Sequence, residues 1–294
     1  MFGEGITLKT ALNYHSTIIT QYDSIIGVSD MGLIIPDEDI EGLVEQEFQS
    51  LRISPEKKGK IMGQYLKIVE DKDSSDVNGN GNGNGNSNGN SNRQGENGLY
   101  GFKRVRPHLL RVGLLNSRAS KALGRPQELA FTSGLLHDFG KTSIKDKTVY
   151  NANDFNDEHR EEMKSHVESG FNMIHSAFPE EASVILWHHH FQKNPYPEVE
   201  RIKELIGSLP FPRFFISKYM AARRFMREGL QLALVDFYDS LVTRNNKKYD
   251  GAVKPADSYD FLVSEYPGYM RLINRLYKGK VFGQDYAKVL AKPF

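Results

Sequence analysis

Residues 127–140, QELAFTSGLLHDFG, decide the fold of this 294-residue chain. Their apolar side chains recur three and four positions apart, which is the spacing of one face of an α-helix. The same period runs through residues 109–124, 161–178, 180–190 and 230–242, with few strand-like alternations and no repeat of fixed period between them. We therefore expect an all-α fold, a helical bundle whose facing helices can build a site in the core.

A low-complexity segment divides the chain unequally. Residues 78–92 read NGNGNGNGNSNGNSN and contain no side chain that a core could bury. Ordering a residue costs about 1–2 kcal/mol of backbone entropy, which such a segment cannot offset, so we predict a disordered linker over 72–98. Before it, 1–71 would form a small N-terminal domain of three short helices: one in 6–26, one from Pro36-Asp37 and one from Ser54-Pro55. Residues 99–294 would form the second domain.

The composition excludes several classes of protein. The chain has 38 Lys and Arg, 37 Asp and Glu, nine His and no Cys. Without Cys there is no disulfide framework, zinc ribbon or thiolate cluster, so a metal would need nitrogen and oxygen ligands. A net charge of +1 favours neither a polymeric nucleic acid nor an anionic membrane surface as partner. No apolar run reaches the roughly 18 residues of a membrane helix, and the start MFGEGITLKT lacks a signal-peptide core, so we expect a soluble cytoplasmic protein without membrane insertion.

Chemistry-bearing side chains gather in and beside the apolar helical stretches: His108, His137, Asp138, His166, the run His188-His189-His190, and Asp236. His108, His137 and His166 are 29 residues apart, which places them on successive helices. Neighbours on a helix point about 100° apart, so His137 and Asp138 reach one centre only if it lies between their directions. Unpaired polar groups are costly to bury, and a carboxylate bridging two metal ions would account for this set.

Several of these motifs carry a family resemblance. The string GLLHDFGK at 134–141, with His108 and Arg111 upstream in HLLRVG, resembles the HD superfamily of metal-dependent phosphohydrolases. The stretches DEHREEMKSHVESG at 157–170 and WHHH at 187–190, with Tyr196-Pro197, are similar to the HD-GYP branch. VDFYDSL at 235–241, followed by Arg244 and Lys247, resembles the closing aspartate segment of that branch and its R-x-x-K motif.

The resemblance implies a site with two divalent metal ions, commonly iron or manganese, and the ligand types are also compatible with zinc. Asp138 would bridge the two ions. His108, His137 and Asp236 would hold one ion, and His166, His188 and His189 would hold the other. Asp138 and Lys141 are then the catalytic candidates, and the substrate-binding candidates are Lys141, Tyr196, Arg244 and Lys247.

The implied reaction is hydrolysis of the phosphodiester of cyclic di-GMP, to pGpG, to GMP or to both. Two cations close together can activate water and neutralise charge on the scissile phosphate. The segment HHHFQKNPYP departs from the GYP motif, because Pro195 stands where a glycine is expected before Tyr196. Two alternatives therefore stay open: an HD-type hydrolase of another nucleotide or phosphate ester, and a non-catalytic effector that binds a cyclic dinucleotide. A protein partner or a dimer through the N-terminal helices is also left open.

Three further assignments have alternatives. His189-His190 competes with His188-His189 as the ligand pair, and we prefer the latter because Ile185 and Trp187 then match the apolar positions before it. Asp239 is either a carboxylate that orients a ligand or a helix-surface acid. The insertion 198–235 would hold two helical pieces around 210–212, and its basic and aromatic residues either line an anionic pocket, dock a partner or form a solvated face.

Overall fold

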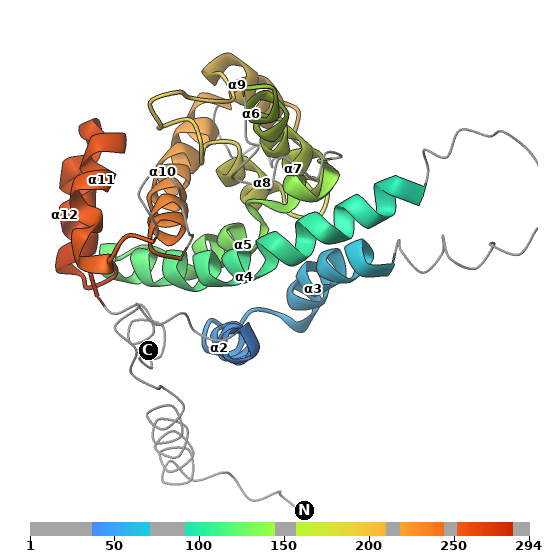
Figure 1. Cartoon of the computed structure of the whole chain (residues 1–294), viewed down its shortest axis with the longest axis horizontal. Coiled ribbons are helices and arrows are strands. Elements are labelled where there is room, and N and C mark those ends of the chain that lie inside the picture. The colour runs from blue at the N-terminus through green and yellow to red at the C-terminus, as the bar shows by residue number, and fades with distance from the viewer. Residues whose placement is uncertain (1–36, 71–91, 145–156, 210–217, 244–251, 285–294) are drawn as a thin grey trace, which may run out of the picture.

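The computed structural model describes residues 37–70, 92–144, 157–209, 218–243 and 252–284, and every regular element in these ranges is helical (Figure 1). The predicted all-α fold is confirmed. Across the same ranges we find no helix with the length and apolar character that a membrane span requires.

The elements follow one another along the chain as α2 (Asp37–Ser50), α3 (Pro55–Glu70), α4 (Asn92–Leu123), α5 (Gln127–Leu136), the 3-10 turn η1 (Phe139–Ser143), α6 (Asp157–Lys164), α7 (His166–Ile174), α8 (Pro179–Ile185), α9 (Val199–Gly207), α10 (Lys218–Thr243), η4 (Pro255–Asp257), α11 (Ser258–Glu265), η5 (Pro267–Tyr269) and α12 (Met270–Lys278).

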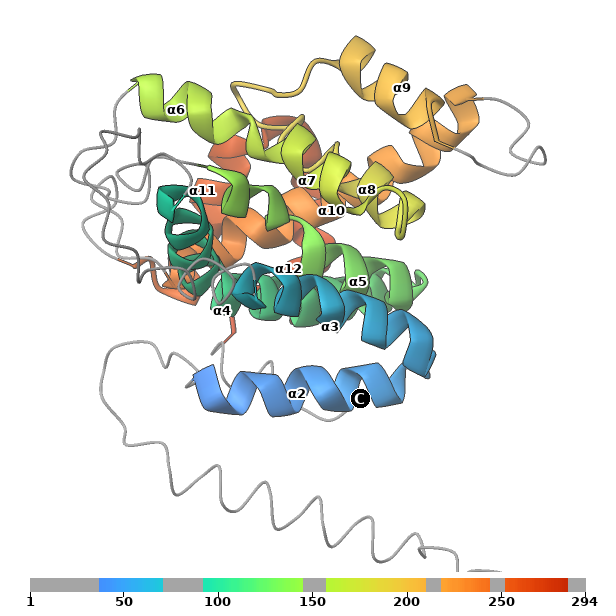
Figure 2. The same ribbon diagram turned by 90° about the vertical axis from the view of Figure 1, so that its right-hand side faces the viewer.

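Helix α4 is the central helix of the bundle. It has 32 residues, which corresponds to about 48 Å, and it packs against α2, α3, α5, α10 and α12. Figure 1 shows α2 and α3 below α4 and α6 to α9 above it, and Figure 2 shows α2 at the end of the bundle opposite α6 and α9. Helices α6 to α9 therefore lie on the far side of α4 from α2, while α3 also contacts α5 and α8.

Helices α4 and α5 approach each other closely at two glycines. A Cβ on Gly134 would lie 2.7 Å from the Cα of Gly113, closer than real Cβ contacts, so neither position tolerates a side chain without a shift. Gly134 belongs to the same stretch as His137 and Asp138. The close crossing therefore fixes the end of α5 against α4, which carries His108.

The two described N-terminal helices begin where the sequence predicts. Pro55 is the first residue of α3, and the Ser54 hydroxyl accepts a hydrogen bond from the backbone N–H of Lys57 at 3.1 Å, as a helix cap does. Their apolar residues belong to the same core as the rest of the bundle: Phe48 of α2 packs edge-on against Phe131 of α5, with ring centroids 5.0 Å apart. The helix expected within 6–26 lies outside the described residues.

The linker prediction differs from the structure at its C-terminal end. Helix α4 begins at Asn92, so 92–98 are helical although we predicted them as part of the linker. The Asn/Gly/Ser run ends at Asn92, and the residues after it include the good helix formers Arg93, Gln94 and Glu96, which continue the helix. Residues 71–91 lie outside the described ranges.

The insertion 198–235 holds the two helical pieces that the sequence predicts. They are α9 and the first part of α10, on either side of the undescribed residues 210–217. Residues 212–217 of the basic and aromatic stretch 212–227 thus lie outside the described residues. Glycine 229 on α10 packs tightly, because a Cβ there would lie 2.3 Å from the Cβ of Trp187. This contact holds α10 against the segment that carries His188 and His189.

Candidate metal centre

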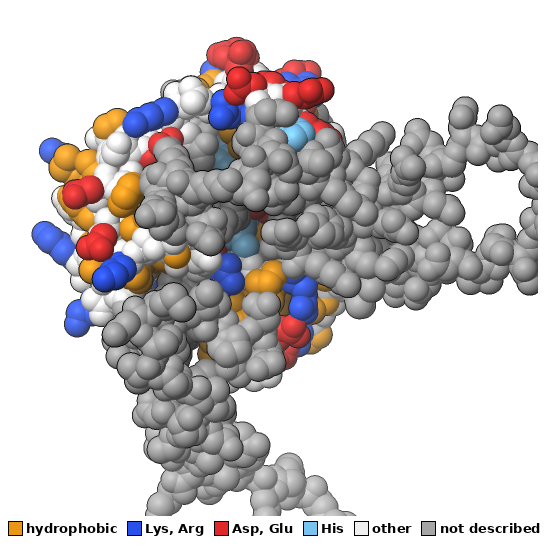
Figure 3. All heavy atoms as spheres, in the orientation of Figure 1, with side chains coloured by type: hydrophobic (Ala, Val, Ile, Leu, Met, Phe, Trp, Pro, Cys, Tyr) orange, Lys and Arg blue, Asp and Glu red, His pale blue; other side chains and the backbone are white. Residues whose placement is uncertain are grey.

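Five segments of the chain bring seven polar side chains to one place in the core. Helix α4 contributes His108, the end of α5 contributes His137 and Asp138, the start of α7 contributes His166, the turn after α8 contributes His188 and His189, and α10 contributes Asp236. All seven are buried, and the most exposed of them, His189, keeps only 7% of its surface. In Figure 3 a little histidine surface is visible near the middle of the face.

The seven side chains form two groups of four that share Asp138. One group is His108, His137, Asp138 and Asp236, and the other is Asp138, His166, His188 and His189; within each group the possible ligand atoms lie within 4.8 Å of one another. The two groups have the same members as the two ligand sets that the family resemblance implies.

Asp138 turns one carboxylate oxygen toward each group. Its Oδ2 lies 3.6 Å from Nε2 of His108 and 3.5 Å from Nε2 of His137. Its Oδ1 lies 3.2 Å from Nε2 of His166 and 3.9 Å from Nε2 of His188. This is the arrangement that a carboxylate bridging two ions requires.

The second ring nitrogen of four histidines is held by an oxygen acceptor. Nδ1 of His137, His166 and His188 each bonds the carbonyl three residues earlier, at 2.9, 2.5 and 2.6 Å. Nδ1 of His108 bonds Oδ2 of Asp239 at 2.6 Å. Because these acceptors hold the ring proton on Nδ1, the lone pair of Nε2 faces the centre, as in metal-bound histidine. Nδ1 of His189 differs, since it lies 2.8 Å from Nε2 of Gln192.

Asp239 orients a candidate ligand and is not a surface acid. It is fully buried, and Arg111 donates to it through Nε at 2.9 Å and through Nη2 at 3.3 Å. Burial acts to raise the pKa of Asp239, but Arg111 and His108 outweigh it, and the pKa lies below its ordinary value. The carboxylate is therefore charged and holds the His108 ring in place. In the sequence, the spacing of three residues between Asp236 and Asp239 indicated this role. Nothing in the sequence indicated that Arg111 pairs with Asp239.

The charges at the centre suit cation ligands. Burial acts to raise the pKa of Asp138 and Asp236. It is outweighed at Asp138 by Lys141, His137 and His166, and at Asp236 by His108 and His137, so both pKa values lie well below the ordinary range. Burial, with His137 and His166 adding to it, lowers the pKa of His188 to about 3, and burial with His188 and His166 holds that of His189 well below its usual value. At neutral pH these groups are two carboxylates and two neutral imidazoles.

Lys141 and Tyr196 lie beside the cluster. The Nζ of Lys141 forms a short ion pair with Oδ2 of Asp138, and the lysine side chain is largely buried. The Tyr196 ring stacks on His189, with centroids 4.6 Å apart and planes 23° apart. Burial raises the pKa of Tyr196, and Asp138 and Asp236 add to the effect, so the phenol keeps its proton. Arg244 and Lys247, the other substrate-binding candidates, lie outside the described residues.

His190 and two other histidines lie outside both groups. The ring of His190 packs edge-on against Trp187, and its Nδ1 lies 3.4 Å from the carbonyl of Pro197. His175 stacks on Phe171, and His159 is a partly exposed residue of α6. This placement agrees with our preference for His188 and His189 as the ligand pair.

The donor set fits a pair of metal ions. Four buried atoms that face the centre have no hydrogen-bond partner among the described residues: Nε2 of His108, His137 and His189, and Oδ1 of Asp138. Buried polar atoms without partners are rare and costly. A bound cation would satisfy the first two nitrogens and the Asp138 oxygen as they stand, and Nε2 of His189 once the Gln192 amide is turned so that its oxygen accepts the ring proton on Nδ1. Imidazole and carboxylate together are ligands for iron, manganese or zinc.

One family model, described as HD domain, matches residues 105–262 of the chain. The match includes all seven side chains of the centre together with Lys141, Tyr196 and Asp239. No curated protein matches the chain, and no solved structure does.

Proposed function

The chain belongs to the HD domain family, a family of metal-dependent phosphohydrolases, and from this premise we propose that it hydrolyses the phosphodiester of cyclic di-GMP at a centre of two metal ions. The observation that carries the proposal is the shared carboxylate: Asp138 presents one oxygen to each of two four-membered groups of ligand atoms.

In this proposal His108, His137 and Asp236 hold one ion, His166, His188 and His189 hold the other, and Asp138 holds both. When bound, such a pair of ions lowers the pKa of water and offsets the charge of the phosphate. The protein supplies the preorganised donors, and burial excludes other water from the site.

Two side chains would act on the substrate directly. The ammonium of Lys141, already beside Asp138, would bind a phosphate oxygen brought to the centre. The Tyr196 hydroxyl keeps its proton at neutral pH and would donate a hydrogen bond to another phosphate oxygen. One face of the Tyr196 ring stacks on His189, and we assign the hydroxyl to the phosphate.

Support for a cyclic dinucleotide comes from sequence motifs around the centre. The WHHH run, Tyr196-Pro197, and the R-x-x-K formed by Arg244 and Lys247 are similar to the HD-GYP branch. Pro195 favours a second candidate, hydrolysis of another nucleotide or phosphate ester, because proline fixes φ and removes a donor at a place where the motif has glycine.

The test is a product assay on protein loaded anaerobically with Fe²⁺ or Mn²⁺. The substrates are cyclic di-GMP, a hybrid cyclic dinucleotide and ordinary mononucleotides, and the bound metal is counted in the same samples. We expect cleavage of cyclic di-GMP with about two ions per chain. Cleavage of mononucleotides without cyclic dinucleotides would replace the proposal with the second candidate, and binding of cyclic di-GMP without turnover would show an effector.

Neighbouring histidines offer a matched pair of variants. His188→Ala removes a proposed ligand, whereas His190→Ala removes the same side chain two positions later, outside both groups. We expect His188→Ala to lose at least one ion and at least about a hundredfold in kcat, and His190→Ala to keep both ions. Equal metal content in the two variants would contradict the assignment.

A further inference from the structure

The N-terminal helix α3 lies outside the family match, yet it touches both segments that lead into the two halves of the centre. The match begins at residue 105, and α3 ends at Glu70. One contact is made by Tyr65 with the end of α5, and the other by Lys57 with α8.

Tyr65 bonds the backbone two residues before the first candidate ligand of this segment, His137. Its hydroxyl donates to the carbonyl of Leu135 at 2.7 Å, and both residues are buried. Leu135 lies in the last turn of α5, where carbonyls lack intrahelical partners and need another donor. The carbonyl just before it, that of Gly134, accepts the hydrogen bond from Nδ1 of His137. Tyr65 thus fixes the peptide next to the one that orients a ligand.

The Tyr65 ring also packs on the residue that follows Asp138. It meets Phe139 edge-on, with centroids 4.9 Å apart, and Phe139 is fully buried. One side chain of α3 therefore contacts the chain both before and after His137 and Asp138, at Leu135 and at Phe139. A shift of Tyr65 would move the carboxylate that both groups share.

Lys57 forms the corresponding tie to the second half of the centre. Its Nζ lies 2.7 Å from Oε1 of Glu181, which is buried on α8 and also accepts from Thr132 of α5 at 2.7 Å. Helix α8 ends at Ile185, whose carbonyl orients His188. Charged pairs that are buried on one side are held in one geometry more firmly than exposed ones.

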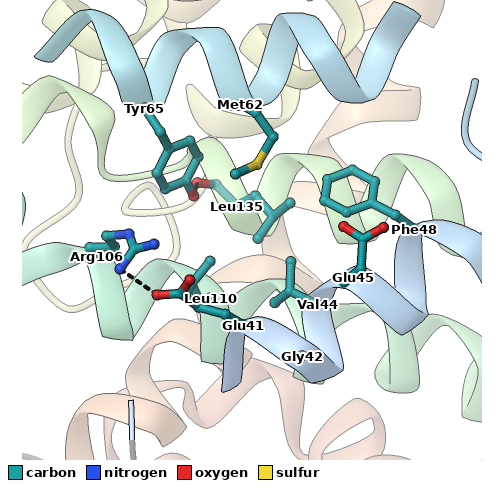
Figure 4. Close-up of a pocket in the computed structure, with 10 residues that line it drawn as sticks. All are labelled: Glu41, Gly42, Val44, Glu45, Phe48, Met62, Tyr65, Arg106, Leu110 and Leu135. Carbon is teal, nitrogen blue, oxygen red and sulfur yellow. Dashed lines mark hydrogen bonds and ion pairs between the residues drawn. The ribbon is translucent and has the colours of Figure 1, made fainter. Parts of the chain in front are cut away.

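A cavity beside Tyr65 makes this contact more important. A space of about 340 Å³ lies between α2 and α3 on one side and α4 and α5 on the other, and its walls include Val44, Met62, Leu110, Tyr65 and Leu135 (Figure 4). Packing is therefore incomplete next to the hydroxyl. The hydrogen bond from Tyr65 to Leu135 therefore does more to fix α5 relative to α3 than it would in a filled interface, where many packing contacts would hold the two helices.

From these contacts we infer that Tyr65 is a positioning residue of the metal centre, so that the helix pair α2–α3 is part of the unit that binds metal. The inference rests on the proposed function, since it assumes that the seven side chains hold metal ions. It also gives the N-terminal helices a defined role, which their sequence does not reveal.

The test compares Mn²⁺ binding in three full-length variants and the wild type. Tyr65→Phe removes only the hydroxyl and keeps the ring on Phe139. Lys57→Gln removes the ion pair with Glu181 and a second one, at 2.9 Å, with Glu128 of α5. Ser117→Ala is the matched control, because it removes the buried 2.5 Å hydrogen bond from Ser117 to Glu47 and weakens the α2–α4 packing. It also removes a 3.1 Å hydrogen bond from Gln127, which lies at the start of α5, at the opposite end from His137. Binding is followed by quenching of Trp187, the single tryptophan and the neighbour of His188, and by equilibrium dialysis.

We expect Tyr65→Phe to bind Mn²⁺ about tenfold more weakly, the low end of the range for partners behind a ligand. Lys57→Gln should also bind more weakly, and Ser117→Ala should bind as the wild type does although it unfolds at a lower temperature. Wild-type affinity in Tyr65→Phe, or an equal loss in Ser117→Ala, would overturn the inference while leaving the proposed function intact. If the wild type itself binds no metal, the proposed function fails and this inference falls with it.

Discussion

Replacing Gly140 by alanine should separate the two halves of the centre. Gly140 is the glycine of HDFGK, in η1, and a Cβ there would lie 1.8 Å from the carbonyl oxygen of His166 and 2.4 Å from the backbone nitrogen of Gly170. Real Cβ atoms essentially never come closer than 3.0 Å, so η1 and α7 must move apart by about 1 Å or more. The obstacles are backbone atoms, which cannot turn aside as a flexible side chain would.

That displacement acts on stability and on the centre together. Overpacking of this kind costs about 1–3 kcal/mol, and with backbone on both sides we expect the upper end. For a domain of this size the melting temperature should fall by roughly 6–12 °C. His166 lies 3.2 Å from Asp138, and a misplacement of about 1 Å at a reactive site can cost a hundredfold in rate. Mn²⁺ affinity should fall with it.

Calorimetry and Mn²⁺ dialysis measure both effects, and Gly63→Ala supplies the control. Gly63 lies inside α3 with no atom within 4 Å of its added Cβ, so the same substitution there should stabilise the protein by about 0.5–1 kcal/mol. If Gly140→Ala melts with the wild type and binds Mn²⁺ equally well, the close approach of η1 to α7 is not what places His166.

Two further predictions concern buried acids. Asp239→Asn should weaken Mn²⁺ binding about 10–100-fold by dialysis, because it removes the charge that holds His108; unchanged affinity would show that the ring needs no such acceptor. For Glu47, burial raises the pKa in the folded state, so its contribution to stability is full below the unfolded pKa of about 4.3 and is lost as pH rises through the folded value. Glu47→Gln should therefore gain stability over the wild type in urea unfolding at pH 7.5 but not at pH 4; a difference independent of pH would contradict this reasoning.

Five of the seven candidate ligands follow or open a helix that the apolar pattern of the sequence predicts, whereas His108 and Asp236 lie inside α4 and α10. His137 and Asp138 follow α5, His188 and His189 follow α8, and the residues that precede these ligands in both helices are buried. The division of the seven ligands into two groups came from the resemblance to one family and needed no distances. The structure places the same atoms together.

Contacts between segments far apart in the chain could not be read in the same way. Tyr65 and Leu135 are 70 residues apart, and nothing in the local pattern of either residue indicates the other. The beginning of α4 was misplaced for a local reason, since a low-complexity run does not show how far a helix extends back toward it. For Asp239 the helical spacing suggested two roles, and only the position of α10 against α4 decides between them.

The way each histidine is held follows from its place in a helix. Carbonyls near helix ends lack partners within the helix, and His137 and His188 use such carbonyls at the ends of α5 and α8, as His166 does at the end of α6. His108 lies inside α4, where the backbone carbonyls are already bonded, so it needs an acceptor from another helix. Asp239 meets that need, and Arg111 keeps it charged. The backbone thus orients three rings, and only for His108 among these four does orientation depend on a side chain that mutation can remove.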